Sequence, residues 1–344
     1  MANVIHSSAA NFLSFVQNSV DPRTGQYTLA IELPALVGND LIGPQLPLRL
    51  SFNPFNDQDS GFGQGWNLAL SQYVPGTHML SLHTGESYKV TGSGPQPAIR
   101  EKKIDSFHFH DDSTSSDQRY RIVHKSGLVE MLTPFGDQQP VALPTRVQAP
   151  SGHHLELTYT LFQGQHCLER IVDGNGLQLL QLDYALGQVT LDLHPGAGTN
   201  GAPFARYTLE LSNRQLRKVI LPTEDKASWR FEYARVRELT CLKKIWTPVG
   251  AVEDIAYEDD GHLLPGGGSR VALPRVTTHL IDPGSGQPPL KTTYTYTYRD
   301  PDTGQQAQNN FLGNNSGITW RDDGQDNLYR ARQAISTAPR LIIG

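Results

Sequence analysis

The sequence predicts an all-β protein made of stacked β-hairpin repeats that form an extended, curved or spiralling antiparallel sheet. Apolar and polar residues alternate with period 2 in several segments, which is typical of strands. Turn pairs containing Gly or Asn separate those segments, as in 173–176 (DGNG) and 186–188 (LGQ). A repeat of about 24 residues runs through the middle of the chain, and this is the length of one hairpin with its connections.

Composition agrees with this fold class and excludes two kinds of partner. The 344 residues are 38% hydrophobic and 18% charged, which suits sheets with one wet face better than tightly packed helices. The formal net charge is -5 and Lys and Arg do not cluster, so we expect no nucleic-acid binding. No apolar run reaches the about 18–20 residues of a transmembrane helix, so we expect no membrane span.

The chain divides into four expected segments. Residues 1–20 form an N-terminal tail or a short helix that ends before Asp21-Pro22; its apolar positions at helical spacing are Ala9, Phe12, Leu13 and Val16. Residues 21–145 form a first β wall segment, 146–264 form hairpin repeats, and 265–344 form further β wall that ends at an open sheet edge. Residues 1–20 also lack a basic stretch followed by an apolar one, so we expect synthesis in the cytoplasm without a Sec signal.

The internal repeat is the most specific observation. Five tyrosines follow one another at intervals of 25, 23, 26 and 24 residues, and a leucine lies nine residues after each of the first four. The tyrosines are Tyr159, Tyr184, Tyr207, Tyr233 and Tyr257, and the leucines are Leu168, Leu193, Leu216 and Leu242. One hairpin cannot bury its apolar face alone, whereas stacked hairpins can, so we expect these nine residues to be structural repeat positions. Cys167 and Cys241 each precede a repeat leucine, which indicates small packed side chains and unreactive thiols.

Several short motifs carry a family resemblance through their order. Segments 20–29 (VDPRTGQYTL), 46–52 (LPLRLSF), 61–66 (GFGQGW), 80–89 (LSLHTGESYK) and 125–130 (KSGLVE) precede the repeats. Tyr159, followed by 168–176 (LERIVDGNG), is similar to a degenerate YD repeat, and 310–313 (NFLG) comes later. In this order the motifs resemble the N-terminal portion of the Rhs/YD-repeat family, toxin shells related to the BC component of Tc toxin complexes. Tyrosine–aspartate pairs are sparse here, which favours a divergent wall segment.

The resemblance implies a function and partners. In the Rhs/YD-repeat family, the sheet spirals into a hollow shell that encloses a C-terminal toxin domain, and the self-cleavage residues lie at the far C-terminal end of this shell. The expected partners are the remainder of the chain's own shell, the enclosed toxin, and a secretion or toxin-complex component that exports it. We therefore expect a structural, encapsulating segment that is no enzyme, with no catalytic, cofactor-binding or metal-binding residues.

Three motifs have chemical interpretations that we weighed against structural ones. The glycines of 61–66 resemble a phosphate loop, but 67–73 alternates like a strand, so a tight turn presenting Trp66 to the core is favoured. His108 and His110 share one strand face and make half of a metal site without a third ligand. The acidic turns 57–61 and 322–326 resemble the start of a calcium loop, but Leu68 stands where the first would need a Glu.

Two other functions stay open at the level of sequence. The first is a carbohydrate- or surface-binding β module, in which the alternating Tyr294, Tyr296 and Tyr298 stack on a ligand. The second is an all-β glycoside hydrolase, for which no spacing selects a pair among the 34 acidic residues.

Overall fold

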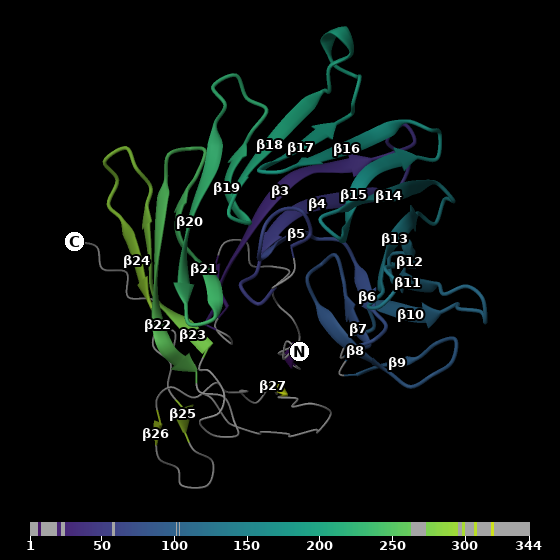
Figure 1. Cartoon of the computed structure of the whole chain (residues 1–344), viewed down its shortest axis with the longest axis horizontal. Helices are drawn as coiled ribbons and strands as arrows, with labels where there is room; N and C mark the ends of the chain where they lie inside the picture. Colours follow the sequence, from purple (N-terminus) through teal and green to yellow (C-terminus); the bar gives the residue numbers. More distant parts are fainter. Residues whose placement is uncertain are drawn as a thin grey trace. The chain divides into compact units, whose positions relative to one another are not determined.

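The computed structural model confirms the predicted all-β class with consecutive antiparallel hairpins (Figure 1). It describes residues 6–7, 19–21, 25–56, 59–100, 102, 104–262, 273–294, 298–299, 306–307 and 318–319. The expected helical positions between Ala9 and Val16 lie outside these residues. Within the described part of the chain, no helix has the length and apolar character that a bilayer crossing requires.

The chain forms two compact units. Unit 1 consists of residues 1–29, 52–58 and 216–344, and unit 2 of residues 30–51 and 59–215. The long strands β3 (Tyr27–Val37) and β4 (Gln45–Phe52) contribute residues to both.

Unit 2 holds two runs of strands that pair in sequence order. One run is β6 (Gln72–Val74), β7 (Met79–Ser81), β8 (Ser87–Thr91) and β9 (Ala98–Arg100). The other is β10 (Phe107–Asp111), β11 (Tyr120–His124), β12 (Val129–Phe135), β13 (Val141–Gln148), β14 (His154–Phe162), β15 (Gln165–Asp173), β16 (Gln178–Ala185), β17 (Gln188–Leu193) and β18 (Ala205–Ser212). In the described part of the chain, the strand ladder between the two runs is the pair Tyr73↔Ala142, between β6 and β13. The short β5 (Trp66–Leu68) pairs next to β4.

Unit 1 continues the same pattern of neighbouring antiparallel strands. Its strands in order are β19 (Gln215–Ile220), β20 (Ser228–Val236), β21 (Leu239–Trp246), β22 (Val252–His262), β23 (Leu273–Asp282) and β24 (Leu290–Thr293). β2 (Ser19–Val20) pairs with the start of β3. Two further pairs join β1 (His6–Ser7) to β27 (Ile318–Thr319) and β25 (Tyr298–Arg299) to β26 (Gln306–Ala307).

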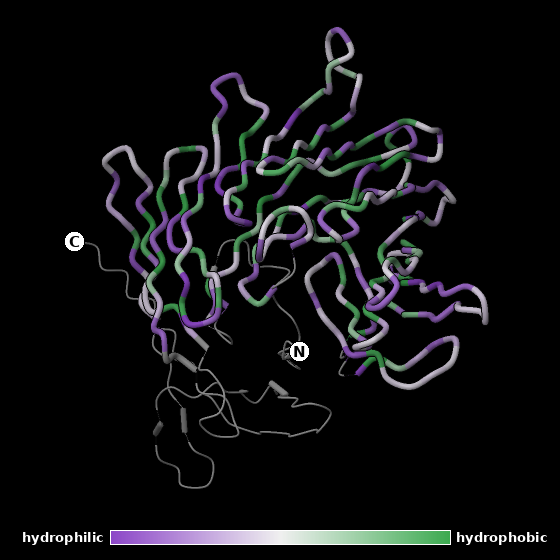
Figure 2. The backbone as a smooth tube through the Cα atoms, in the orientation of Figure 1, coloured by the Kyte–Doolittle hydropathy of each residue, from purple (hydrophilic) through white to green (hydrophobic). Residues whose placement is uncertain are grey.

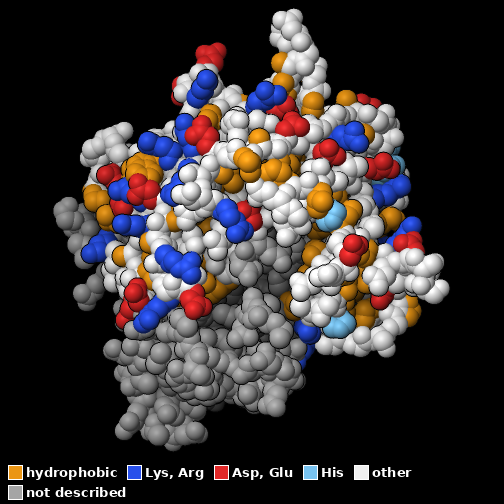
Figure 3. Space-filling model, in the orientation of Figure 1, with side chains coloured by type: hydrophobic (Ala, Val, Ile, Leu, Met, Phe, Trp, Pro, Cys, Tyr) orange, Lys and Arg blue, Asp and Glu red, His pale blue; other side chains and the backbone are white. Residues whose placement is uncertain are grey.

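Strand alternation creates the core. In β14, for example, Leu155 and Leu157 are buried, while Glu156 between them is exposed. Figure 2 shows hydrophobic residues concentrated on the strands and hydrophilic residues at the turns. On the face in Figure 3, acidic and basic side chains are interspersed over the described residues, as expected for a wet sheet surface without a single-sign field.

Candidate functional site

In unit 2, two tyrosine hydroxyls each join a hairpin to the strand that precedes it. The hydroxyl of Tyr159 donates to the carbonyl of Pro144 at 2.7 Å, and that of Tyr184 donates to the carbonyl of Leu168 at 2.8 Å. Burial raises the pKa of both phenols well above the ordinary value, so both stay protonated and donate. The acceptor Leu168 is itself a repeat leucine, so the repeat positions contact one another.

The same arrangement recurs in unit 1. Tyr233 donates to the carbonyl of Leu216 at 2.6 Å, and Tyr257 donates to the carbonyl of Leu242 at 2.8 Å. Both acceptors are again repeat leucines. We call these four bonds, made by Tyr159, Tyr184, Tyr233 and Tyr257, the tyrosine ladder. The fifth repeat tyrosine, Tyr207, is buried, but its hydroxyl has no hydrogen-bond partner among the described residues.

The nine-residue spacing between tyrosine and leucine is a cross-strand pairing. Tyr159 lies opposite Leu168, and Tyr233 lies opposite Leu242. A β-bulge immediately precedes each of these tyrosines. Tyr184 departs from this rule. The turn of its hairpin begins only two residues after it, so Tyr184 pairs with Val189, and the repeat position Leu193 lies opposite Leu180.

The aspartate of the YD-like motif is a backbone acceptor. Asp173 Oδ1 accepts from the amides of Asn175 and Leu177 at 2.9 Å each, which fixes the turn after β15. Asp173 Oδ2 accepts from the amide of Asn39 at 2.7 Å, which fastens the loop after β3 to this turn. Burial raises the pKa of this carboxyl, but the three amides outweigh that effect and lower it.

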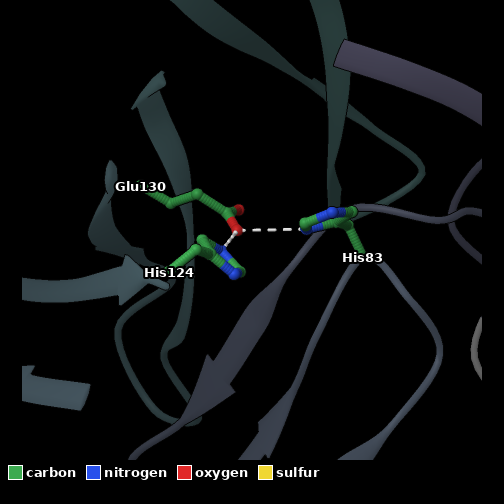
Figure 4. A group of neighbouring side chains, drawn as sticks. All are labelled: His83, His124 and Glu130. Atoms are coloured by element: carbon green, nitrogen blue, oxygen red, sulfur yellow. Dashed lines mark hydrogen bonds and ion pairs between the residues drawn. The ribbon is translucent and has the colours of Figure 1, made fainter. Parts of the chain in front are cut away.

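A second feature of unit 2 is a buried carboxylate with two imidazoles, drawn in Figure 4. Alternation along β12 places Glu130 on the core side with 3% exposure, while Met131 faces out with 38%. His124 Nε2, at the end of β11, lies 2.5 Å from Glu130 Oε1. His83 Nδ1, in the turn after β7, lies 3.1 Å from the same oxygen. We call Glu130, His83 and His124 the His–Glu cluster.

A serine completes the surroundings of that carboxylate. Ser71 is fully buried, and its hydroxyl donates to Glu130 Oε1 at 2.9 Å and accepts from the amide of His83 at 3.0 Å. Burial alone raises the pKa of Glu130, but the hydrogen bonds and charges of His124 and His83 outweigh it and lower the pKa to about 2. Glu130 is therefore an anion at neutral pH, held by donors from three separate chain segments.

Unit 1 contains a smaller buried polar group. Tyr27 donates to Glu253 Oε2 at 2.7 Å, and His279 Nε2 lies 2.8 Å from the same oxygen. All three side chains are buried. Close by, the amide of Val276 donates to the carbonyl of Gly25 at 2.7 Å. These bonds fasten the start of β3 to β22 and β23, so this group is structural.

Other residues considered in the sequence occupy structural positions. Trp66 is buried, and Asp59 Oδ1 accepts from the amides of Gly61 and Gly63 at 3.1 and 2.9 Å, so 61–66 is a tight turn. Cys167 and Cys241 are free and buried. Asp57 and the turn 322–326 lie outside the described residues.

The remaining candidate ligands do not assemble into a site among the described residues. His108 is exposed, and its Nε2 atom lies 3.7 Å from Asp105 Oδ2. No third metal ligand joins His108 and His110 in the described part of the chain. Tyr294 is half-buried and its amide donates to the carbonyl of Thr277. Tyr296 lies outside the described residues, and for Tyr298 the structure gives only its backbone place in β25.

The His–Glu cluster is the group that sequence reasoning missed. Its members are separated by up to 47 positions in the sequence, so no local spacing motif predicts that they come together. One signal was present: the alternation that buries Leu132 also buries Glu130, and a carboxylate on a core face needs partners.

These features define an all-β protein of consecutive antiparallel hairpins with a ladder of tyrosine hydroxyls. No protein-family model and no curated protein matches the chain. Among solved structures, the N-terminal domain of the effector protein SpvB from Salmonella typhimurium is 12% identical, with a TM-score of 0.34 over 77% of this chain and 99% of that one. A TcdB2-TccC3-Cdc42 structure is 14% identical, with a TM-score of 0.40 over 89% of this chain and 20% of that one.

A third similar structure is the Tc holotoxin pore of Photorhabdus luminescens, 11% identical, with a TM-score of 0.33 over 87% of this chain and 16% of that one. The chain therefore spans about a fifth or less of the Tc chains it matches. At these identities the likeness concerns the fold alone.

Proposed function

We propose that this chain is a segment of a β-sheet wall that encloses and protects a toxin domain of the same protein. The observation that carries the proposal is the tyrosine ladder, together with Asp173 at the end of the YD-like motif. The motif that resembles the Rhs/YD-repeat family thus has a physical role in this chain, because its tyrosine, Tyr159, and its aspartate, Asp173, both bind backbone groups outside the motif.

The physical requirement of an enclosing wall is continuity rather than chemistry. A wall must leave no unpaired strand edges between its parts, and it must resist local opening that would release or expose the cargo. Consecutive antiparallel pairing gives the backbone N–H and C=O groups of neighbouring strands their hydrogen-bond partners. Each tyrosine of the ladder adds one hydrogen bond from its hydroxyl to a carbonyl of the preceding strand. The proposal assigns this segment no catalytic role, and it includes synthesis in the cytoplasm followed by export through a dedicated delivery machine.

The test uses the complete reading frame that contains this chain. Limited proteolysis of the native protein should leave the domain beyond the wall intact, while the same domain expressed alone is cut. A wall weakened by Asp173→Ala together with Tyr184→Phe should lose part of this protection, whereas Tyr207→Phe should keep it. Equal cleavage of the domain inside the whole protein and alone would overturn the proposal, as would a reading frame with no further folded domain.

The same experiment separates the alternatives raised by the sequence. Glycan binding by the purified chain that disappears on Tyr294→Ala, without protection of any neighbouring domain, would favour the binding module. Hydrolysis of a glycoside by the purified chain would favour the hydrolase. Among the described residues no specific observation favours either, so the wall is the function we propose.

A further inference from the structure

The position of Glu130 demands an explanation beyond wall building. A carboxylate with 3% exposure in the core face of a strand loses most of its hydration, which costs several kcal/mol unless charged or polar partners replace the water. A wall strand needs only an apolar residue here, as its neighbour Leu132 shows. The chain instead places two imidazoles and a hydroxyl around one oxygen of this carboxylate.

The composition of the cluster matches that of a transition-metal site. Two imidazole nitrogens and one carboxylate oxygen are a ligand set used for Zn²⁺ and related ions, whereas Ca²⁺ and Mg²⁺ prefer oxygen ligands alone. The three ligand atoms all lie within 4.8 Å of one another. The ring centroids of His83 and His124 are 5.2 Å apart, and Figure 4 shows both rings approaching the carboxylate of Glu130.

The distances fit an ion with a small adjustment. For Zn²⁺ bound tetrahedrally at about 2.0–2.2 Å, neighbouring ligand atoms stand about 3.3–3.5 Å apart. His83 Nδ1 is already 3.1 Å from Glu130 Oε1. His124 Nε2 is 2.5 Å from it, so this pair would open by about 0.8–1 Å, within the reach of side-chain rotation. Ser71 Oγ, at 2.9 Å from Glu130 Oε1 and 3.5 Å from His83 Nδ1, is placed to hold a water in the fourth position.

We propose that His83, His124 and Glu130 bind one Zn²⁺ ion. The inference is independent of the toxin-wall proposal, because it depends only on the cluster. Because an ionised carboxylate only accepts hydrogen bonds, we assign the ring hydrogens to His83 Nδ1 and His124 Nε2 in the absence of metal. On binding, each neutral ring carries its hydrogen on the other nitrogen, and the freed lone pairs coordinate the ion. Both rings keep 13–15% of their side chains exposed, which gives a dissolved ion access.

The place of the cluster in the fold indicates what the ion would do. Among the described residues, the strand ladder between the run β6–β9 and the run β10–β18 consists of one residue pair, Tyr73↔Ala142. The amide of Asp111 in β10 also donates to the carbonyl of Pro95 at 3.1 Å, and Gln96 Nε2 lies 3.2 Å from His108 Nδ1. The two runs share an apolar core as well, which includes Leu82 next to His83, and Ile122 and Leu132 two residues from His124 and Glu130. His83 belongs to the first run, and His124 and Glu130 belong to the second. A bound ion would therefore cross-link the run β6–β9 to the run β10–β18.

The experiment uses the full 344-residue chain, stripped with a chelator and then titrated with Zn²⁺ by calorimetry. Co²⁺, read by its visible absorption, reports on tetrahedral coordination, and elemental analysis gives the stoichiometry. We expect one ion per chain and a higher melting temperature in the metal-bound protein. His83→Asn, which changes only a turn residue, and Glu130→Gln should each weaken binding by at least about 100-fold, more than the loss of an outer partner of a ligand.

The double variant His108→Ala, His110→Ala is the matched control, because it removes two histidines from the face of β10 opposite the buried Phe107 and Phe109 in the same unit. It should bind Zn²⁺ like the unchanged protein. The proposal is overturned if the stripped chain binds no stoichiometric Zn²⁺, if His83→Asn binds as tightly as the unchanged protein, or if the control loses binding instead. Circular dichroism of each variant identifies any that fails to fold, and His83→Asn then decides the outcome.

Discussion

The tyrosine ladder yields a sharp prediction, because the chain contains its own control. Tyr184→Phe removes a hydroxyl that donates to the carbonyl of Leu168 at 2.8 Å and keeps the ring. Tyr207→Phe makes the same chemical change at a buried repeat tyrosine whose hydroxyl has no partner among the described residues. The difference between the two variants therefore measures the hydrogen bond and not the packing of the ring.

The expected magnitude follows from the burial of this bond. A hydrogen bond of this kind contributes about 0.5–1.5 kcal/mol net, and the upper half applies when a poorly solvated carbonyl is left behind. We expect Tyr184→Phe to lower the free energy of unfolding by about 1–1.5 kcal/mol, or the melting temperature by about 2–6 °C for a unit of this size. Tyr207→Phe should stay within about 0.5 kcal/mol of the unchanged protein.

Thermal and urea unfolding of both variants, followed by circular dichroism, provide the assay. Hydrogen exchange of the amides in β15 and β16 should show the loss in Tyr184→Phe locally. If Tyr184→Phe is no more destabilised than Tyr207→Phe, the hydroxyl bonds do not hold the hairpins together, and the ladder is only a packing feature.

Three further predictions concern other residues of the chain. Asp173→Asn should make the free energy of unfolding fall less steeply as the pH is lowered. Because the pKa of Asp173 is lowered in the folded protein, its carboxylate stabilises the fold fully above the unfolded pKa of about 3.9, and this stabilisation is lost as the pH falls through the folded pKa. Urea midpoints measured from about pH 6 to about pH 2 that fall as steeply in the variant as in the unchanged protein would contradict this. Burial raises the pKa of Cys167 to about 11 and of Cys241 to about 12, so a thiol reagent should label them only after unfolding; rapid labelling of the native chain would disprove it. Gly38→Ala places a methyl group 2.7 Å from the Cβ atom of Asp173 and should cost about 1–3 kcal/mol, while Gly76→Ala, with open space around it, should cost less in the same melt.

The hairpins were predictable from sequence because their signals are local. Alternation sets which side chains are buried, and the recurrence of tyrosine and leucine reflects cross-strand pairs such as Tyr159↔Leu168. The ladder itself was not predictable, since a backbone carbonyl accepts the bond and carries no residue identity. For the same reason, the sequence does not distinguish Tyr207, which lacks the bond, from Tyr184, which has it.

The His–Glu cluster was out of reach for a different reason. His83 and Glu130 come together because β6–β9 fold back onto β10–β13, and among the described residues the strand ladder between those runs is limited to Tyr73↔Ala142. Sequence reasoning considered His108 and His110 because they lie on one strand face, and found no third ligand for them. The buried Glu130 was the usable clue, because alternation alone assigns it to the core face.

The direction of the ladder has a consequence for how such a protein is made. The donor tyrosine always follows the acceptor leucine in the chain. Tyr184 follows Leu168 by 16 residues, Tyr233 follows Leu216 by 17, and Tyr257 follows Leu242 by 15. During translation each acceptor carbonyl is therefore synthesised before its donor tyrosine. Each new hairpin can then form its hydrogen bonds with a hairpin that has already folded. Short-range closure of this kind is fast and keeps the exposed edge to one strand at a time. The hairpins can thus fold in the order of translation, each one closing against the hairpin before it.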